Sequence, residues 1–367
     1  MQRLNRRTLL QAGTLLAAAA VAPIASACTT GGSGQPTAAP ASPPPAVSAT
    51  AAASSGPLPT ARTASTARTA STATTGAPLA VATASRPTGA TATTSLDWQR
   101  VDAAMGKPGA LQPGGVYRFS FPRTDLQVTA RGVPLKAGFA LGSHVEFLQV
   151  GMNAAMFMGD LVLTEDEANP VLTKLQQGGI DLAGLHNHLL GETPRVMYLH
   201  IMGHGDPVST AAAIRAALAE SKTPLATPAA GQAEQVDLDS AALDRTLGYQ
   251  GKANGAIYQY SIPRGEKIMD MGMELPPAMG VATAINFQPT GGGKAAITGD
   301  FVLLGGEVRG VSRALRAAGI DVTALHSHGL SDEPRLFYLH FWAVDDAAKL
   351  AQGLRAALAT TNSAKPK

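Results

Sequence analysis

Strands and helices are predicted from the spacing of apolar residues between positions 96 and 360. Apolar residues alternate or run together, as in β-strands, in GVYRFSF at 115–121 and AMFMGDLVL at 155–163. They recur at helical spacing in STAAAIRAALAE at 209–220 and AAKLAQGLRAALA at 347–359. The glycine-rich PTGGGK at 289–294 lacks the spacing of a phosphate-binding loop, so we expect a hairpin loop there.

Three further helices are predicted from their end signals. DWQRVDAAMG at 97–106 and DSAALDRTLG at 239–248 begin with an acidic residue and end at glycine. NPVLTKLQQGG at 169–179 places Asn as N-cap, Pro at the first helical position and Gly past the end. Strands and helices in this order, without regular βαβ alternation, favour an α+β class with helices packed on an antiparallel sheet.

The folded part of the sequence is a duplication. YRFSFPR at 117–123 matches YQYSIPR at 258–264, and MGDLVL at 158–163 matches TGDFVL at 298–303, with offsets of 141 and 140 residues. Such a constant offset indicates two copies of one fold. We predict a first repeat domain over 96–218, a linker over 219–235 and a second repeat domain over 236–360.

Residues 1–27 predict an export signal. A basic segment with Arg6 and Arg7 precedes an apolar run that is shorter than the roughly 20 residues of a membrane span. RRTLL resembles the bacterial twin-arginine signal, with an ordinary Sec signal as the alternative. Cys28, the only cysteine, follows ASA as in a bacterial lipobox, so we expect it to be lipidated rather than discarded by cleavage. The protein would then be anchored to the bacterial membrane, facing the periplasm or the outside.

The composition of residues 28–95 predicts a disordered tether, because Ala, Thr, Ser, Pro and Gly cannot bury enough apolar surface to fold.

The net charge of +3 comes from Arg3, Arg6 and Arg7 in the signal. Without them the 29 basic residues become 26, equal to the 26 acidic residues. A mature protein without net charge is not expected to bind nucleic acid, because binding to the phosphate backbone needs a clustered positive surface. The expected partners are the membrane, through the lipid, and a cell-wall or small-molecule ligand.

Three histidines of each repeat follow one pattern. GLHNHLLGETPRVMYLH at 184–200 and ALHSHGLSDEPRLFYLH at 324–340 each predict a hairpin around a turn. If the first turn is centred near Thr193, His186 lies opposite His200, and His188 projects to the same face opposite Tyr198. Three imidazoles per hairpin could then hold one divalent metal ion. The metal candidates are His186, His188 and His200, with a second site at His326, His328 and His340; Tyr198 and Tyr338 are candidate hydrogen-bond donors to these histidines.

The first repeat has additional polar residues. His144 and Glu146 in SHVEF are replaced by Ala284 and Asn286 in the second repeat, and His204 is replaced by Val344. His144 and His204 are therefore candidate additional ligands and Glu146 a candidate general base in the first repeat only. For every histidine the alternative is structural packing, and for Glu146 it is a solvated strand position.

Structural roles are predicted for other polar residues that the two repeats share. Asp160 and Asp300 follow glycine, which favours tight turns. Arg195 and Arg335 could pair with Glu192 and Asp332 or bind an anion, and the salt bridge is favoured. Arg123 and Arg264 leave the same two alternatives open.

The stretches MGDLVLTEDEANPVL, GLHNHLLGETPRVMYLHIMGHGD, VATAINFQPTGGGKAAITGDFVL and ALHSHGLSDEPRLFYLHFW, behind a lipobox, resemble the LppY/LpqO family of bacterial lipoproteins over residues 96 to about 360. The resemblance implies an envelope lipoprotein with a duplicated domain of unknown function, and it implies no reaction. The H-x-H pairs are also similar to the zinc-binding pairs of lysostaphin-type cell-wall peptidases. Those enzymes need a His and an Asp four residues apart, and His204 and Asp206 are too close.

Three hypotheses remain, and whether the protein is an enzyme stays open. The first is a divalent metal site, for zinc, manganese, iron or copper, in the first repeat. The second is a non-enzymatic envelope module that binds a ligand and uses its histidines structurally. The third is a zinc-dependent peptidase.

Overall fold

The computed structural model describes residues 96–226 and 234–365. The predicted signal, Cys28 and the tether lie outside these residues. Among the described helices, none is long and apolar enough to cross a membrane.

The first repeat contains a six-stranded sheet in the order β1-β2-β5-β6-β9-β7 and a small sheet in the order β4-β3-β8. Every strand pair in it is antiparallel. The strands are β1 Ala110–Gln112, β2 Val116–Pro122, β3 Thr129–Ala130, β4 Val133–Pro134, β5 Gly142–Gln149, β6 Ala155–Thr164, β7 Leu182–His186, β8 Glu192–Thr193 and β9 Val196–Gly205; the helices are α1 Trp98–Met105, α2 Ala137–Ala140, α3 Glu165–Gln177 and α4 Pro207–Leu218.

The second repeat reproduces this arrangement, with the strand orders β10-β11-β14-β15-β18-β16 and β13-β12-β17. The strands are β10 Lys252–Asn254, β11 Ile257–Pro263, β12 Ile268–Asp270, β13 Met273–Leu275, β14 Ala282–Gly291, β15 Lys294–Leu304, β16 Asp321–His326, β17 Asp332–Glu333 and β18 Leu336–Asp346; the helices are α5 Ser240–Leu247, α6 Val308–Ala317, α7 Ala347–Leu358 and the short turn η1 Pro277–Val281. The protein is thus α+β, with two tandem antiparallel sheets and helices. The predicted PTGGGK loop joins β14 to β15.

The predicted ends of α1 and α5 and the predicted C-terminal end of α3 at Gly178 are confirmed, but the predicted start of α3 is wrong. The Asp97 carboxylate accepts a hydrogen bond from the Gln99 amide at 3.1 Å, and Gly106 ends α1 with φ +78°. Helix α3 begins at Glu165, and Pro170 lies inside it. The earlier start follows from a capping box between Thr164 and Glu167, which satisfies the first amides better than an Asn169 cap could.

Arg123 and Arg264 are structural rather than ligand-binding residues. The Arg123 guanidinium is fully buried, donates to Glu167 at 2.8 Å and to Asp125, and reaches the Val162 carbonyl at 2.6 Å. Arg264 makes the equivalent contacts with Glu266, Glu307 and Val302. These bonds leave neither guanidinium directed toward solvent, so the anion-binding alternative is excluded for both.

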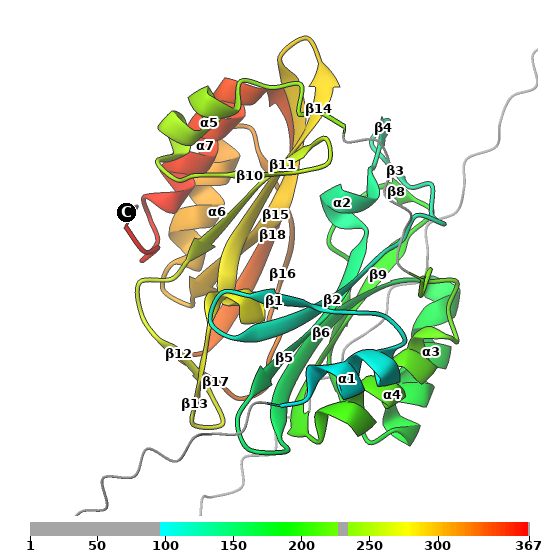
Figure 1. Cartoon of the computed structure of the whole chain (residues 1–367). Helices are drawn as coiled ribbons and strands as arrows, with labels where there is room; N and C mark the ends of the chain where they lie inside the picture. The colour runs from blue at the N-terminus through cyan, green and yellow to red at the C-terminus, as the bar shows by residue number, and fades with distance from the viewer. Residues whose placement is uncertain (1–95, 227–233, 366–367) are drawn as a thin grey trace, which may run out of the picture. The chain divides into compact units, whose positions relative to one another are not determined.

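Alternate residues of each large sheet face two different environments. Figure 1 shows α1, α3 and α4 on one face of the first sheet, and α5, α6 and α7 on one face of the second. Buried apolar side chains such as Phe147, Leu161 and Leu199 pack on this face, as do their equivalents in the second repeat. The other face of each sheet carries the histidines and meets residues of the other repeat. Strand alternation therefore separates a repeat's own core from the boundary between repeats.

Two apolar clusters at this boundary mix residues of both repeats. In one, Phe139 packs edge-on against Trp342 with ring centroids 6.0 Å apart. In the other, Met156 and Met158 pack among Val302 and Tyr338. Burial of these side chains stabilises the pairing of the repeats around the polar residues described next.

Candidate metal centre

The register of the histidine strands differs from the prediction by two residues. His186 lies opposite Tyr198 rather than His200, and β7 ends at His186, so His188 belongs to the following loop. A two-residue shift keeps every side chain on the same face, because the side-chain period of a strand is two. The Nε2 atoms of His186 and His200 are therefore still only 2.7 Å apart. The second repeat brings Nε2 of His326 within 2.8 Å of Nε2 of His340.

The histidines of the two repeats form one cluster, which corrects the expectation of a separate site in each repeat. The rings of His186 and His326 have centroids 3.4 Å apart. His188 stacks on His340 at 3.8 Å, and His328 stacks on His200 at 3.9 Å. Each loop histidine thus contacts the strand histidine of the other repeat.

Burial lowers the pKa of all six imidazoles, to about 4 for His186 and about 3 for His326. The histidines are therefore neutral at pH 7, and each ring has one protonated nitrogen and one nitrogen with a free lone pair.

Backbone carbonyls determine which nitrogen carries the proton. Nδ1 of His340 lies 3.0 Å from the Gly299 carbonyl, and Nδ1 of His326 lies 3.4 Å from the Ser327 carbonyl. Because a carbonyl only accepts hydrogen bonds, both Nδ1 atoms carry the proton, and the two facing Nε2 atoms carry lone pairs. His186 repeats this, with Nδ1 at 3.2 Å from the Asn187 carbonyl. In the His326–His340 pair two lone pairs therefore face each other, and they repel unless a cation lies between them. Within the described chain, Nδ1 of His200 has no such carbonyl, so Nε2 of His200 can instead carry the proton and donate to Nε2 of His186.

Several buried polar atoms of the cluster have no hydrogen-bond partner within the described residues. They are Asp160 Oδ1, His188 Nε2, His200 Nδ1 and both ring nitrogens of His328. Unpaired buried polar groups are costly, so these atoms are candidates to contact a bound ion, water or small molecule.

Asp160 and Asp300 correct the expectation of tight turns. Both lie inside long strands, Asp160 opposite His200 and Asp300 opposite His340. Burial and the neighbouring Asp300 carboxylate raise the pKa of Asp160 well above its usual value, and burial raises the pKa of Asp300 to about 7. A sequence signal could have revealed Asp160 and Asp300. Each is a carboxylate in an otherwise apolar strand, at a position whose side chain lies on the same face as the histidines.

Four groups of side chains bring ligand atoms within 4.8 Å of one another. They are His186, His200, His326 and His328; His188, His326 and His340; Asp160, His188 and His200; and Asp300, His328 and His340. Every imidazole of the two hairpins belongs to at least one group. The first and second groups draw ligands from both repeats.

The additional polar residues of the first repeat, His144, Glu146 and His204, do not all lie in the same place. His144 lies opposite Asp160 on β5, and its Nδ1 is 2.9 Å from Glu146, whose carboxylate is fully buried and 3.1 Å from the Arg118 guanidinium. His204 lies further along β9, opposite Met156, and belongs to none of the four ligand groups of the described chain. The structure therefore keeps His144 near the cluster, at the cleft, and leaves His204 outside it.

Tyr198 and Tyr338 contact the loop histidines with their rings, and for Tyr198 the expectation of a hydrogen-bond donor to a histidine is wrong. Tyr198 stacks under His188 with ring centroids 3.3 Å apart, and its hydroxyl donates to the Ala140 carbonyl at 2.7 Å. Tyr338 stacks under His328 at 3.4 Å. The tyrosines position the rings by stacking, and the Tyr198 hydroxyl is directed to the backbone.

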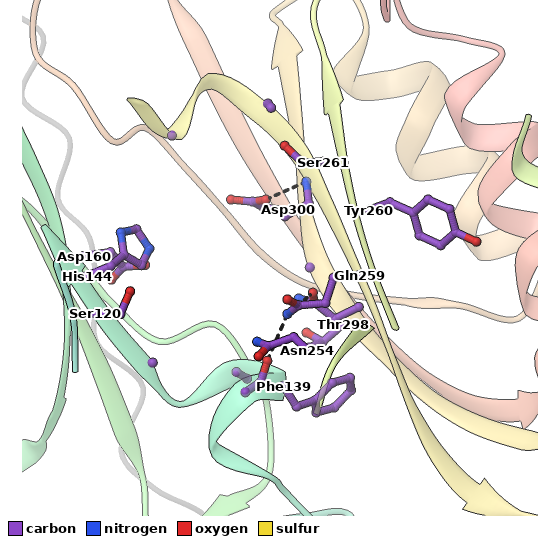
Figure 2. A pocket seen from close by; sticks show the side chains of 18 of the residues that line it. Ser120, Phe139, His144, Asp160, Asn254, Gln259, Tyr260, Ser261, Thr298 and Asp300 are labelled. Atoms are coloured by element: carbon purple, nitrogen blue, oxygen red, sulfur yellow. Dashed lines mark hydrogen bonds between the residues drawn. The ribbon is translucent and has the colours of Figure 1, made fainter. Parts of the chain in front are cut away.

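A cleft of about 770 Å³ opens between the two repeats and reaches His188, His328 and His340. Figure 2 shows one wall with His144, Asp160 and Ser120, and the facing wall with Ser261, Gln259 and Asp300. The cluster is thus accessible to a small molecule from this side.

Outside the cluster, acidic residues form local contacts. Asp332 pairs with Arg335 at 3.2 Å, as predicted, whereas Arg195 lies 3.7 Å from Glu165 instead of pairing with Glu192. His328 and Asp332 have the four-residue spacing found in the cell-wall peptidases. Asp332 accepts from the Leu336 amide and belongs to none of the four ligand groups among the described residues, so that pair does not form the peptidase site.

The sequence profile described as Domain of Unknown Function (DUF1259) matches residues 99–220 and 241–360. The chain belongs to this family. The two matches coincide with the two sheets and with the two halves of the histidine cluster. The DUF1259 description establishes a duplicated domain and assigns it no reaction.

Other comparisons add little. No curated protein matches the chain. Two solved structures are similar over 70% of it: a trimeric bacterial microcompartment shell protein, PduB, 14% identical over 95% of its length with a TM-score of 0.19, and EtuB from Clostridium kluyveri, 10% identical over 96% with a TM-score of 0.17. Scores this low support no conclusion about this chain.

Proposed function

We propose that the paired repeats bind a divalent transition-metal ion through a histidine cluster that both repeats supply. The observation that carries the proposal is the pair of facing Nε2 atoms of His326 and His340, which are 2.8 Å apart and both present lone pairs. Backbone carbonyls hold the Nδ1 protons of His186, His326 and His340, so Nε2 of each presents a lone pair, and His326 shares one ligand group with His186 and another with His340. This is the usual arrangement around metal-bound imidazoles.

Structural packing alone explains the cluster less well. Neutral histidines that served only the fold would pair an N–H with a lone pair. In His326 and His340 the only N–H is at Nδ1, so neither of the two facing Nε2 atoms has a proton to donate. The unpaired atoms of His188 and His328 would add further cost. A bound cation removes both difficulties, because it accepts electron pairs and needs no proton.

The ligand types narrow the choice of metal. Imidazole nitrogens favour zinc, copper and iron, while manganese would require the Asp160 and Asp300 carboxylates as well. Both carboxylates lie at the edge of the cluster, so all four metals belong in the first experiment.

Metal analysis of the full chain, purified without a His tag, tests the proposal. We expect at least one equivalent of metal as purified or after reconstitution with zinc, manganese, iron or copper, and its loss in His186→Ala/His200→Ala. His204→Gln is the matched control, because His204 lies outside the ligand groups, and it should retain the metal. A wild-type chain that stays metal-free after reconstitution would exclude the proposal.

We further propose that the protein is an envelope lipoprotein anchored through Cys28. Support comes from the lipobox-like sequence ASAC and the basic, apolar segment before it. Cys28→Ala should move the protein from the detergent phase to the aqueous phase in a Triton X-114 partition of expressing cells. Equal partition of both proteins would contradict the anchor.

A further inference from the structure

The two walls of the cleft differ in charge at equivalent positions. On the first wall, Arg118 faces Glu146 across β2 and β5, and the ion pair measures 3.1 Å. On the second wall, Gln259 faces Asn286 across β11 and β14, and the amide of Gln259 donates to Asn286 at 2.9 Å. A charged pair in one repeat is thus replaced by a neutral pair of similar shape in the other.

The charged pair supports a histidine that only the first repeat has. Glu146 is fully buried, whereas the His144 side chain is 21% exposed and lines the cleft. Nδ1 of His144 lies 2.9 Å from one Glu146 oxygen and 3.1 Å from the other. A carboxylate only accepts, so Nδ1 carries a proton, and in the neutral ring Nε2 carries the lone pair. The equivalent position of the second repeat is Ala284.

From this geometry we infer that His144 is a proton acceptor for a small polar molecule bound in the cleft, and that Glu146 is its positioning residue. The inference rests on the proposed metal site, because the same cleft reaches the histidine cluster. It also changes the two roles expected from the sequence: the buried Glu146 cannot touch a ligand and so cannot be the base, and His144 is engaged as a base rather than a metal ligand.

The chemistry of the walls indicates the class of molecule. Gln250, Asn254, Gln259 and Asn286 contribute amides, and Ser120, Ser261 and Thr298 contribute hydroxyls. Such walls favour a hydroxyl-bearing polar molecule over an apolar one. On binding, the ligand O–H bond would break, its proton would move to Nε2 of His144, and the electron pair would stay on the ligand oxygen. The Glu146 carboxylate would stabilise the imidazolium, as a carboxylate does for a general-base histidine.

The first experiment needs no metal. ¹⁵N NMR of the histidine-labelled, metal-free chain should show His144 as the tautomer with protonated Nδ1 and bare Nε2. Glu146→Ala should shift His144 toward the Nε2-protonated tautomer, while Asn286→Ala, the matched change on the facing wall, should leave it unchanged. An Nε2-protonated His144 in the wild type would overturn the inference, and a merely structural Glu146 would not move the tautomer.

The second experiment counts protons. Acetohydroxamate, a small polar ligand with an acidic O–H that also binds zinc, is titrated into the zinc-loaded chain in two buffers of different ionisation enthalpy. The wild type should release almost no proton to the buffer, because His144 takes it, and His144→Gln should release about one per bound ligand. Equal release, no binding by a zinc-loaded wild type, or loss of zinc from His144→Gln would each overturn the inference. A wild type that takes up no zinc would instead overturn the proposed function, and the tautomer measurement would still decide the role of His144.

Discussion

The imidazole of His188 in the first repeat stacks on the imidazole of His340 in the second, with ring centroids 3.8 Å apart and planes inclined by 19°. His328 and His200 repeat this relationship at 3.9 Å. Each hairpin therefore completes the histidine set of the other, and neither repeat holds the whole cluster alone. This relationship makes the duplication necessary for the proposed site.

Removal of ligands from different repeats should have coupled effects. His200→Ala and His328→Ala remove two members of one ligand group, so the double variant should bind metal hardly more weakly than the worse single variant. Each single variant should weaken binding about tenfold or more. Competition with a chromophoric chelator measures these affinities. Fully additive losses from the two repeats would contradict a shared group.

The metal-free protein should lose stability in mild acid. The folded pKa values of the cluster histidines lie below the usual 6.5, at about 4 for His186 and about 3 for His326. The stability that each histidine contributes is therefore complete above pH 6.5 and is lost as pH falls toward 4, because the unfolded chain takes up that proton first. Asp160 and Asp300, whose folded pKa values are raised, take up protons first in the folded chain and offset the loss from two of the six histidines. The loss is at most about 1.4 kcal/mol per pH unit for each histidine.

Urea unfolding at pH 7, 6 and 5 measures this dependence. In His186→Asn/His326→Asn the slope of unfolding free energy against pH should be shallower, since two of the proton-binding groups are gone. An unchanged slope would show that other residues cause the acid sensitivity.

Loss of a buried arginine should destabilise either repeat. Arg123→Met leaves Glu167 without its 2.8 Å partner in a buried place, and Arg264→Met does the same to Glu307 at 2.7 Å. We expect each to lower the free energy of unfolding by about 3–5 kcal/mol. Arg195→Met is the control, because its contact with Glu165 is exposed and 3.7 Å long, and it should cost less than about 1 kcal/mol. Chemical denaturation compares the three; similar losses in all would contradict this account.

Gly299 should not tolerate a side chain. A Cβ there would lie 2.0 Å from the Ala284 carbonyl, so β14 and β15 would have to separate beside Asp300. Gly299→Ala should lower the unfolding free energy by about 2–3 kcal/mol. Gly306→Ala, with nothing within 4 Å of its Cβ, should leave the melting temperature nearly unchanged. Calorimetry measures the melting temperatures of both variants. Equal melting temperatures would contradict the predicted clash at Gly299.

Local patterns in the sequence determined much of the fold. The duplication followed from the constant offset, and the ends of α1 and α5 followed from their acidic caps and terminal glycines. The α+β class followed from the order of strands and helices. The start of helix α3 was the exception, because Glu167 both caps the helix and pairs with Arg123, which lies 44 residues away in the chain.

The composition of the candidate site was decided only by tertiary structure. Alternation along β7 and β9 determined that His186 and His200 share a face, because the side-chain period of a strand is two. It did not determine the register, because strands shifted by two residues have the same alternation of side chains. It also did not determine which residues cover that face. The approach of His186 to His326, and the position of Asp160 and Asp300 beside the cluster, depend on packing between residues about 140 positions apart. No local pattern encodes such contacts, so only the folded pair of repeats could reveal that two predicted half-sites are one.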